Sequence, residues 1–186
     1  MTRIVAGTAG GRRLTVPPRG TRPTSERVRE ALFNALESLV DLDGLWVLDL
    51  YAGSGALGFE ALSRGAAEAT FVESDRRAVE VLRRNAAALG LPGARVVAGS
   101  VEAFVASEPD HRYDVVLADP PYAVSNEALG EVLARLVAGG WLAEDAVLVV
   151  ERAARDAEPL WPAGITPIRS RRYGDTVTHW AHSLSD

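Results

Sequence analysis

The stretch that decides the fold reads Trp46-Val47-Leu48-Asp49-Leu50-Tyr51-Ala52-Gly53-Ser54-Gly55-Ala56-Leu57-Gly58. It begins with a largely apolar run of strand length, and its glycines match the pattern G-x-G-x-x-G at the start of an expected helix. Glycine permits a tight turn and lets a ligand approach the backbone N–H groups at a helix N-terminus. The stretch therefore predicts a strand, a ligand-binding turn and a helix in immediate succession.

Strand and helix patterns alternate from this stretch onward. We expect strands at 46–50, 69–73, 95–98, 115–119 and 147–151, and helices at about 56–64, 75–89, 101–107 and 125–138. Such alternation is typical of an α/β fold with a parallel sheet covered on both faces. Residues 165–171 and 176–183 bracket Tyr173-Gly174-Asp175, which predicts a closing antiparallel hairpin. Residues 152–164 have the composition of a surface connection.

The chain before the glycine stretch has a different organisation. Residues 3–6 and 12–16 are expected to form two short strands around a glycine-rich turn, as a small β-hairpin extension. Thr24 or Ser25 can cap a helix whose apolar positions share one face: Val28, Leu32, Ala35, Leu36 and Leu39. We therefore divide the chain into an N-terminal hairpin and basic arm, residues 1–22, and a main domain, residues 23–186.

Charge is distributed unevenly along the 186 residues. The whole chain has a formal net charge of -5, yet residues 1–34 hold seven Arg and two Glu, and the remainder is correspondingly acidic. A basic arm on an acidic body favours contact with phosphate, although an ordinary solvated loop would have the same composition. The clustering therefore makes the arm a candidate nucleic-acid contact.

Several classes of protein are not expected from the composition. There is no cysteine, no apolar run of membrane-spanning length and no apolar signal-peptide core near the N-terminus. The three histidines, His111, His179 and His182, are too scattered to indicate a metal site. We expect a cytoplasmic, monomeric protein without metal or membrane contact.

Carboxylates near the ends of the first two expected strands of the sheet indicate which cofactor the glycine turn binds. Glu73 ends the second strand twenty residues after Gly53, where a carboxylate can accept hydrogen bonds from ribose hydroxyls. Asp49 would repel a pyrophosphate but attract the cationic S-adenosylmethionine (SAM), and it can alternatively order the loop through backbone N–H groups. NAD, or a tight turn with an exposed Glu73, remains the alternative. The expected cofactor-binding residues here are Asp49, Tyr51, Ala52, Gly53, Ser54, Gly55, Glu73 and Ser74.

The third expected strand leads into Ser100 and Val101. In open α/β sheets ligands bind outside the carboxyl ends of the strands, so these residues are candidates for contact with an adenine ring. Ser100 could accept a hydrogen bond from the adenine amine, and it could equally cap the next helix. Both roles stay open.

A second motif, Asp119-Pro120-Pro121-Tyr122, follows the fourth expected strand and so meets the glycine turn at the same edge of the sheet. Proline fixes φ and has no N–H, so the turn is stiff and its carbonyls can accept hydrogen bonds. A flat ligand with an amino group could donate to Asp119 and to a proline carbonyl while Tyr122 stacks on its ring. The alternative is an Asp-Pro turn with a surface tyrosine.

These motifs together resemble a known family. They comprise Arg3-Ile4-Val5-Ala6-Gly7, Gly11-Arg12-Arg13-Leu14, Arg22-Pro23-Thr24, residues 27–34, residues 49–55, residues 119–122 and Tyr173-Gly174-Asp175-Thr176. The chain resembles class I SAM-dependent methyltransferases that act on an exocyclic amine of a base. It is most similar to the bacterial family that methylates N2 of guanine 966 in 16S ribosomal RNA, and Ser100 stands where that family often has an acidic residue.

The resemblance implies a Rossmann-like fold with a central seven-stranded, mostly parallel sheet, and SAM as the cofactor. It makes Asp119, Pro120, Pro121 and Tyr122 the expected catalytic residues. It also implies that the arm docks on 16S rRNA, free or in an assembling or assembled small subunit, with phosphate contacts from Arg3, Arg12, Arg13, Arg19 and Arg22. Thr24 and Arg27 are expected near the methionine end of SAM, or alternatively as a helix cap and an exposed side chain.

Two other functions remain open at this point. Asp-Pro-Pro-Tyr would serve an N6-adenine methyltransferase on DNA or RNA equally well. A nucleotide-binding or RNA-binding module without catalysis is the second alternative.

Overall fold

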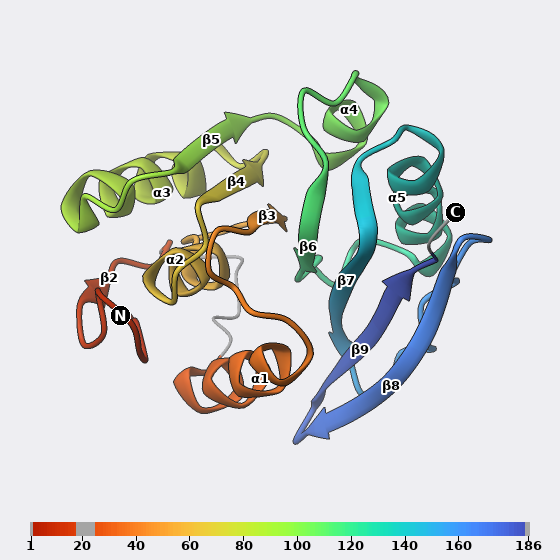
Figure 1. Cartoon of the computed structure of the whole chain (residues 1–186), viewed down its shortest axis with the longest axis horizontal. Coiled ribbons are helices and arrows are strands. Elements are labelled where there is room, and N and C mark those ends of the chain that lie inside the picture. The colour runs from red at the N-terminus through yellow and green to blue at the C-terminus, as the bar shows by residue number, and fades with distance from the viewer. Residues whose placement is uncertain (1, 18–24, 185–186) are drawn as a thin grey trace.

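A seven-stranded sheet forms the centre of the computed structural model, which describes residues 2–17 and 25–184 (Figure 1). The strands lie in the order β5-β4-β3-β6-β7-β9-β8, with β9 antiparallel to both of its neighbours and the first five parallel. Their bounds are β3 Trp46–Leu50, β4 Glu68–Glu73, β5 Ala94–Ala98, β6 Tyr113–Ala118, β7 Leu142–Ala153, β8 Ile165–Tyr173 and β9 Thr176–Ser183. The predicted mostly parallel sheet with a closing hairpin is confirmed.

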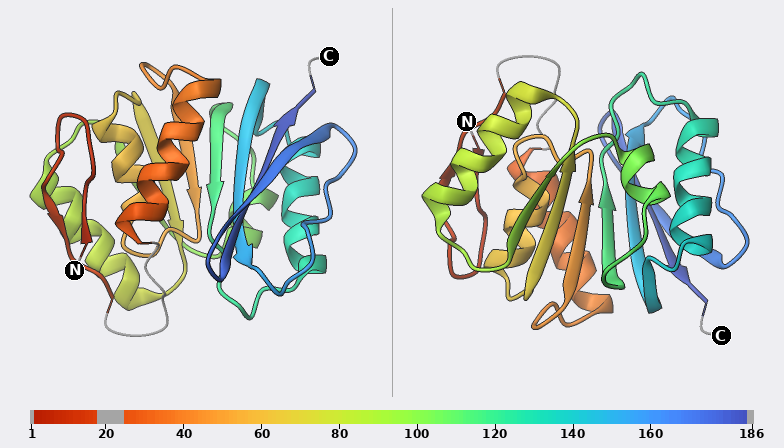
Figure 2. Two further views of the ribbon diagram at one scale, coloured as in Figure 1. Left: turned by 90° about the horizontal axis from the view of Figure 1, so that it is seen from below. Right: turned by 90° about the horizontal axis from the view of Figure 1, so that it is seen from above.

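Helices cover both faces of this sheet, as Figure 2 shows. Helices α1 (Glu26–Leu39), α2 (Ala56–Ser63) and α3 (Arg76–Leu89) contribute to one apolar cluster, and α4 (Val101–Ala106) and α5 (Asn126–Ala138) to a second one on the other face. Helices α1, α4 and α5 each begin with a serine side chain, Ser25, Ser100 and Ser125, that accepts a backbone N–H from the first turn. Strand residues therefore face apolar side chains on both sides, which explains their continuous hydrophobic runs.

Strand β7 is longer than predicted. It covers Leu142–Ala153 in place of 147–151, so Arg152 and Ala153, expected in a surface connection, are buried strand residues. The extension has a tertiary cause, because the β9 ladder continues to pair Arg152 with Val177 and Ala153 with Thr176. The sequence after Glu151 is polar and contains no local signal for this pairing.

The predicted N-terminal hairpin is present, but its strands are shorter than expected. Strand β1 covers Thr2–Arg3 and β2 covers Arg13–Leu14, in place of 3–6 and 12–16. Beyond these short strands, side chains of the main domain accept hydrogen bonds from the backbone N–H groups of the hairpin. The N–H groups of Val5 and Ala6 donate to the Glu60 carboxylate at 2.8 and 3.1 Å, and that of Thr15 donates to Asn85 Oδ1 at 2.9 Å.

The buried face of α1 also differs from the prediction. Its centre is formed by Arg29, Leu32, Phe33 and Leu36, while Leu39 is 42% exposed and Val28 only partly buried. Arg29 is turned inward because its Nε donates to Glu60 Oε1 at 3.1 Å, and both side chains are fully buried.

Glu60 is the centre of a buried network that holds the hairpin on the main domain. Besides the two hairpin N–H groups and Arg29, it accepts from Arg64 Nε at 2.9 Å. The Arg29 guanidinium in turn donates to the Thr2 hydroxyl and to the Arg3 carbonyl. Glu60 thus joins α1, α2 and the hairpin through a single carboxylate.

We expect Glu60→Ala to lower the free energy of unfolding by about 3–5 kcal/mol, because it leaves a buried guanidinium unpaired. Urea denaturation of the parent and the variant measures the change. The matched control is Glu37→Ala, which removes a 43% exposed carboxylate 3.5 Å from Arg64 and should cost about 1 kcal/mol or less. Equal losses in the two variants would contradict the central role of Glu60.

Candidate active site

A cavity of about 250 Å³ lies at the carboxyl ends of β3, β4, β6 and β7. Both sequence motifs line it: the glycine turn from Tyr51 to Ser54, and the Asp119–Tyr122 turn after β6. The register explains this meeting, because β3 lies between β4 and β6 and all three run parallel. Two turns that are far apart in the sequence therefore line the same cavity.

The glycine turn combines unusual backbone angles with close packing. Tyr51, Gly53 and Gly55 have φ values of 59°, 58° and 85°, the left-handed region that favours glycine. A Cβ on Gly58 would lie 2.3 Å from the Phe71 ring, so this glycine serves the contact between α2 and β4. The pattern in the sequence thus encodes both the turn and the packing of the following helix.

Asp49 lies beneath the turn and is almost completely buried. Its Oδ2 accepts a hydrogen bond from the Gly58 N–H at 3.0 Å, so it orders the loop, the alternative role left open by the sequence. Burial raises the pKa of Asp49 well above its usual value; the Gly58 hydrogen bond lowers it, and the nearby Asp119 and Glu73 carboxylates raise it further. Asp49 also lines the cavity, where a bound cation would stabilise its ionised form.

Glu73 connects β4 to the glycine turn. Its Oε1 accepts from the Gly53 N–H at 2.8 Å and its Oε2 from the Asp75 N–H at 2.8 Å. A carboxylate has room for further donors besides one hydrogen bond on each oxygen. Glu73 can therefore hold the turn and still accept hydrogen bonds from a hydroxyl of a ligand.

The cavity lining is strongly acidic. Among the described residues it contains one guanidinium, that of Arg152, against six carboxylates: Asp49, Glu73, Asp75, Asp119, Glu151 and Asp156. Such a surface repels a pyrophosphate and attracts a cation. The charge pattern favours SAM, which carries an ammonium and a sulfonium and no phosphate, over NAD.

The Asp119–Tyr122 turn presents a carboxylate and a ring to the cavity. Pro120 is buried, Asp119 is partly buried and Tyr122 is 57% exposed. The Arg155 guanidinium lies over the Tyr122 ring, 5.4 Å from its centroid, a cation–π contact that holds one face of the ring. The Pro121 carbonyl accepts from the Val124 N–H at 3.0 Å, which leaves the Pro120 carbonyl as the candidate acceptor for a ligand amine.

Sequence reasoning missed four polar lining residues: Asp75, Glu151, Arg152 and Asp156. Val150 pairs with Ala118, so the residues after Val150 lie alongside the Asp119 turn. The signal that identified Asp119, a polar residue at the carboxyl end of a buried strand, applies equally to Glu151. Arg152 and Asp156 carry no such signal, because the composition of residues 152–164 predicts a surface connection.

Some expected site residues lie elsewhere. Ser100 accepts from the Ala103 N–H at 3.0 Å as the cap of α4, and neither it nor Val101 lines the cavity. Ser74 and Arg27 are exposed and outside the lining as well. Thr24, Arg19 and Arg22 lie outside the described residues.

Tyr51 adds an uncommitted polar group to the lining. Its hydroxyl is buried without a hydrogen-bond partner in the described part of the chain, and burial raises its pKa to about 12. The hydroxyl therefore stays protonated at neutral pH and can donate.

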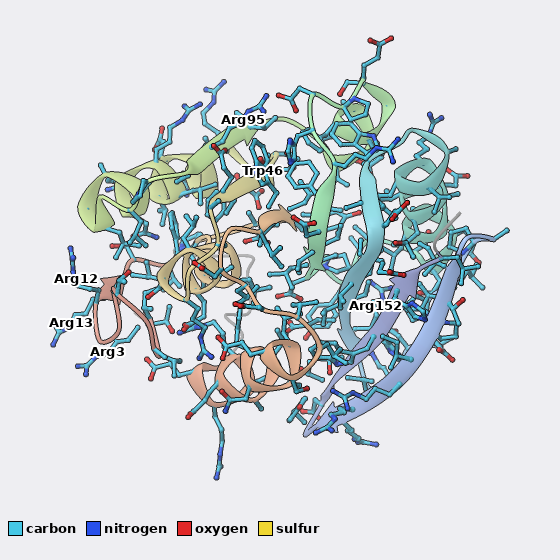
Figure 3. All side chains as sticks on the ribbon, viewed as in Figure 1. Arg3, Arg12, Arg13, Trp46, Arg95 and Arg152 are labelled. Atoms are coloured by element: carbon cyan, nitrogen blue, oxygen red, sulfur yellow. The ribbon has the colours of Figure 1, made fainter. Side chains whose placement is uncertain are left out.

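The arginines of the hairpin are exposed. Figure 3 shows Arg3, Arg12 and Arg13 at its outer edge, and all three side chains are exposed. One Arg12 nitrogen donates to the Ala88 carbonyl on α3 at 2.6 Å, which fixes that side chain along the helix. The hairpin thus presents a fixed basic edge.

The described residues offer neither a metal site nor a membrane-spanning helix. No group of three or more His, Asp or Glu side chains there is arranged to hold a metal ion. Within the same ranges, no helix combines the length and the apolar character needed to cross a membrane.

Fold and site together define the class of protein. A parallel sheet closed by an antiparallel hairpin, with the last strand of the chain inserted between β7 and β8, is the class I methyltransferase fold. The acid-lined cavity lies over the glycine turn, at the carboxyl edge of the sheet where open α/β folds bind ligands.

The particular family follows from comparison with known proteins. The family model described as "Conserved hypothetical protein 95" matches residues 2–182. The chain is 43% identical to Ribosomal RNA small subunit methyltransferase D of Escherichia coli, over 94% of this chain and 86% of the relative. It is 35% identical to the protein of the same name from Haemophilus influenzae, over 92% of this chain and 89% of that relative.

A solved structure agrees with these relatives. The yhhF protein of Escherichia coli superposes with a TM-score of 0.88 at 36% identity, over 100% of this chain and 99% of that one. The chain belongs to the family described as Conserved hypothetical protein 95, and the family resemblance read from its motifs is confirmed.

The raised pKa of Asp49 predicts a pH-dependent stability difference. For a carboxyl whose pKa is raised in the folded state, the linked stability is present below its unfolded pKa, near 3.8, and is lost as the pH rises through the folded pKa. We therefore expect Asp49→Asn, which keeps an acceptor for the Gly58 N–H, to gain stability relative to the parent as the pH rises from near 3.8 through the raised folded pKa.

Urea denaturation without added cofactor, repeated across this pH range, measures the difference. Glu80→Gln, on the exposed face of α3, is the control and should show no such trend. A difference between Asp49→Asn and the parent that does not change with pH would contradict the prediction.

Proposed function

We propose that this protein is an rRNA methyltransferase that transfers a methyl group from SAM to the exocyclic N2 amine of a guanine in 16S rRNA, guanine 966. The observation that carries the proposal is the shared cavity of the glycine turn and the Asp119–Tyr122 turn. The relatives named as small-subunit rRNA methyltransferases support the substrate class. Because the proposed substrate is ribosomal RNA, we infer that the protein acts in the cytoplasm.

The residues of the cavity fit SAM. When bound, SAM supplies an electrophilic methyl group on a sulfonium. Glu73 would accept hydrogen bonds from the ribose, and the buried Asp49, in its ionised form, would offset the positive charge of the cofactor. The glycine turn lets the ligand approach the backbone closely.

The second turn would hold and activate the base. An aromatic amine is a poor nucleophile, because its lone pair is delocalised into the ring. Hydrogen bonds from the amine to Asp119 and to the Pro120 carbonyl would favour a more pyramidal nitrogen, and Asp119 would receive the proton that the amine gives up. Tyr122 stacks on the base. Alignment of two reactants can supply about 7–11 kcal/mol of the barrier reduction.

The substrate must present an unstacked base. Enzymes that modify a base extrude it or use one that is already single-stranded, and sequence-specific RNA recognition favours loops for the same reason. The basic edge of the hairpin would position the RNA through phosphate contacts, which do not depend on sequence.

We expect Asp119→Ala to lower turnover by about 100- to 1,000-fold, because the charged acceptor at the reacting amine is lost. Tritium transfer from labelled SAM to small ribosomal subunits and to free rRNA measures turnover, and calorimetry with S-adenosylhomocysteine should show retained cofactor binding. Glu144→Ala, at the opposite end of β7, is the control. Normal turnover of Asp119→Ala would remove the carboxylate from the mechanism.

Analysis of the methylated product separates the candidate functions. N2-methylguanine supports the proposal, N6-methyladenine would establish the adenine alternative, and no transfer to either RNA substrate would favour a module without catalysis.

Arg13→Gln should weaken rRNA binding and reduce the slope of log affinity against log salt concentration by about 0.7, the value for one phosphate contact on a single strand. Filter binding at several salt concentrations measures both quantities. The control, Arg135→Gln in the last turn of α5, should leave them unchanged. Weaker binding at an unchanged salt slope would argue against a phosphate contact of Arg13.

A further inference from the structure

Arg152 and Asp156 form a charged pair in the cavity wall beside the Asp119–Tyr122 turn. Arg152 Nη2 lies 4.0 Å from Asp156 Oδ2, and the two side chains are 5% and 32% exposed. This separation is longer than a hydrogen bond, so neither group is committed to the other. Figure 3 shows Arg152 within the body of the molecule, unlike the hairpin arginines.

The Arg152 guanidinium has an N–H donor without a hydrogen-bond partner among the described residues. Its Nη2 donates to the Val124 carbonyl at 2.9 Å, while its Nε is buried without a hydrogen-bond partner among the described residues. A buried cation is costly unless its hydrogen bonds are satisfied. Because Arg152 lines the cavity, an acceptor on a bound ligand could take a hydrogen bond from this guanidinium.

Arginine commonly binds phosphate, but phosphate does not suit this position. Six carboxylates share the lining with Arg152, and they would repel an anion. A neutral acceptor flanked by a donor fits better, because Asp156 can take the donor while Arg152 takes the acceptor. The edge of a nucleobase has this form.

Guanine and adenine differ at the edge in question. Next to its N2 amine guanine carries the N1–H donor and then the O6 acceptor, whereas the N6 amine of adenine is followed by an N1 acceptor. A site complementary to this edge of guanine therefore needs two acceptors, for the N2 amine and N1–H, followed by a donor for O6. Asp119, Asp156 and Arg152 all line the cavity and can supply these groups, and the pairing of Ala118 with Val150 brings the end of β7, with Arg152, next to the Asp119 turn.

We propose that the Arg152–Asp156 pair selects guanine by reading its Watson–Crick edge: Asp156 accepts the N1–H and Arg152 donates to O6, while Asp119 holds the N2 amine. This inference rests on the proposed function and extends it from the reacting amine to the identity of the base. Recognition of a displaced base by hydrogen bonds to this edge is a general strategy of base-modifying enzymes.

The test uses rRNA in which the target guanine is replaced by 2,6-diaminopurine. This base keeps the N2 amine, but it has an amine in place of O6 and no hydrogen on N1. We expect the parent protein to methylate it at least about 100-fold less efficiently, as kcat/KM, because the pair then faces groups of the wrong polarity.

Two variants should reduce this preference. In Asp156→Asn the amide can donate to the bare N1, and in Arg152→Gln the amide oxygen can accept from the new amine. Each should narrow the guanine-to-diaminopurine ratio at least about tenfold. Glu131→Gln and Arg135→Gln, exposed on α5, are the charge-matched controls and should keep the parent ratio.

The outcomes are distinguishable. Equal methylation of both bases by the parent overturns the inference and leaves methyl transfer to guanine intact. No transfer to either base by the parent overturns the proposed function, and the inference with it. A parent-like ratio in folded variants that still bind S-adenosylhomocysteine also overturns the role of the pair, since damage to the fold would lower both rates without changing their ratio. The comparison of bases in the parent needs no variant.

Discussion

The parallel register of four strands is the constraint on which the candidate site depends. Strands β4, β3, β6 and β7 end at one edge of the sheet, and each brings a carboxylate there: Glu73, Asp49, Asp119 and Glu151. Since parallel strands align their carboxyl ends, residues as far apart in the sequence as Asp49 and Glu151 share one cavity. The negative charge is gathered by the hydrogen-bonded pairing of the backbones. It does not come from direct attraction between these side chains, which repel one another.

Gathering that charge opposes stability. Asp49 is the clearest case, because its burial and its acidic neighbours raise the pKa and disfavour the ionised form. A cationic ligand would reduce this cost. The repulsion between carboxylates that destabilises the ligand-free protein therefore favours binding of a cation. Such conflicts between local stability and ligand binding are expected at functional sites.

The hairpin is coupled to the same site by short-range hydrogen bonds. Asn85 on α3 accepts from the Thr15 N–H and donates to the carbonyls of Thr15 and Ser54, each at 2.9 Å. Val16 then contributes to the cavity wall. Together with Glu60, Asn85 makes the hairpin a fixed part of the molecule, so its basic edge has a set position relative to the glycine turn.

The sequence by itself determined the alternation of strands and helices, the glycine turn and the closing hairpin, because each of these follows from local periodicity and turn chemistry. It also brought Glu73 and the Asp119 turn to one edge, since parallel topology requires it. Only the tertiary structure decided the inward turn of Arg29, the shortened hairpin strands, the extension of β7 and the place of Arg152. In each case the partner is remote in sequence: Glu60 for Arg29, Glu60 and Asn85 for the hairpin, and β9 for the end of β7. A charged side chain or a strand end is fixed by the group it meets across the fold, and a local pattern does not contain that group.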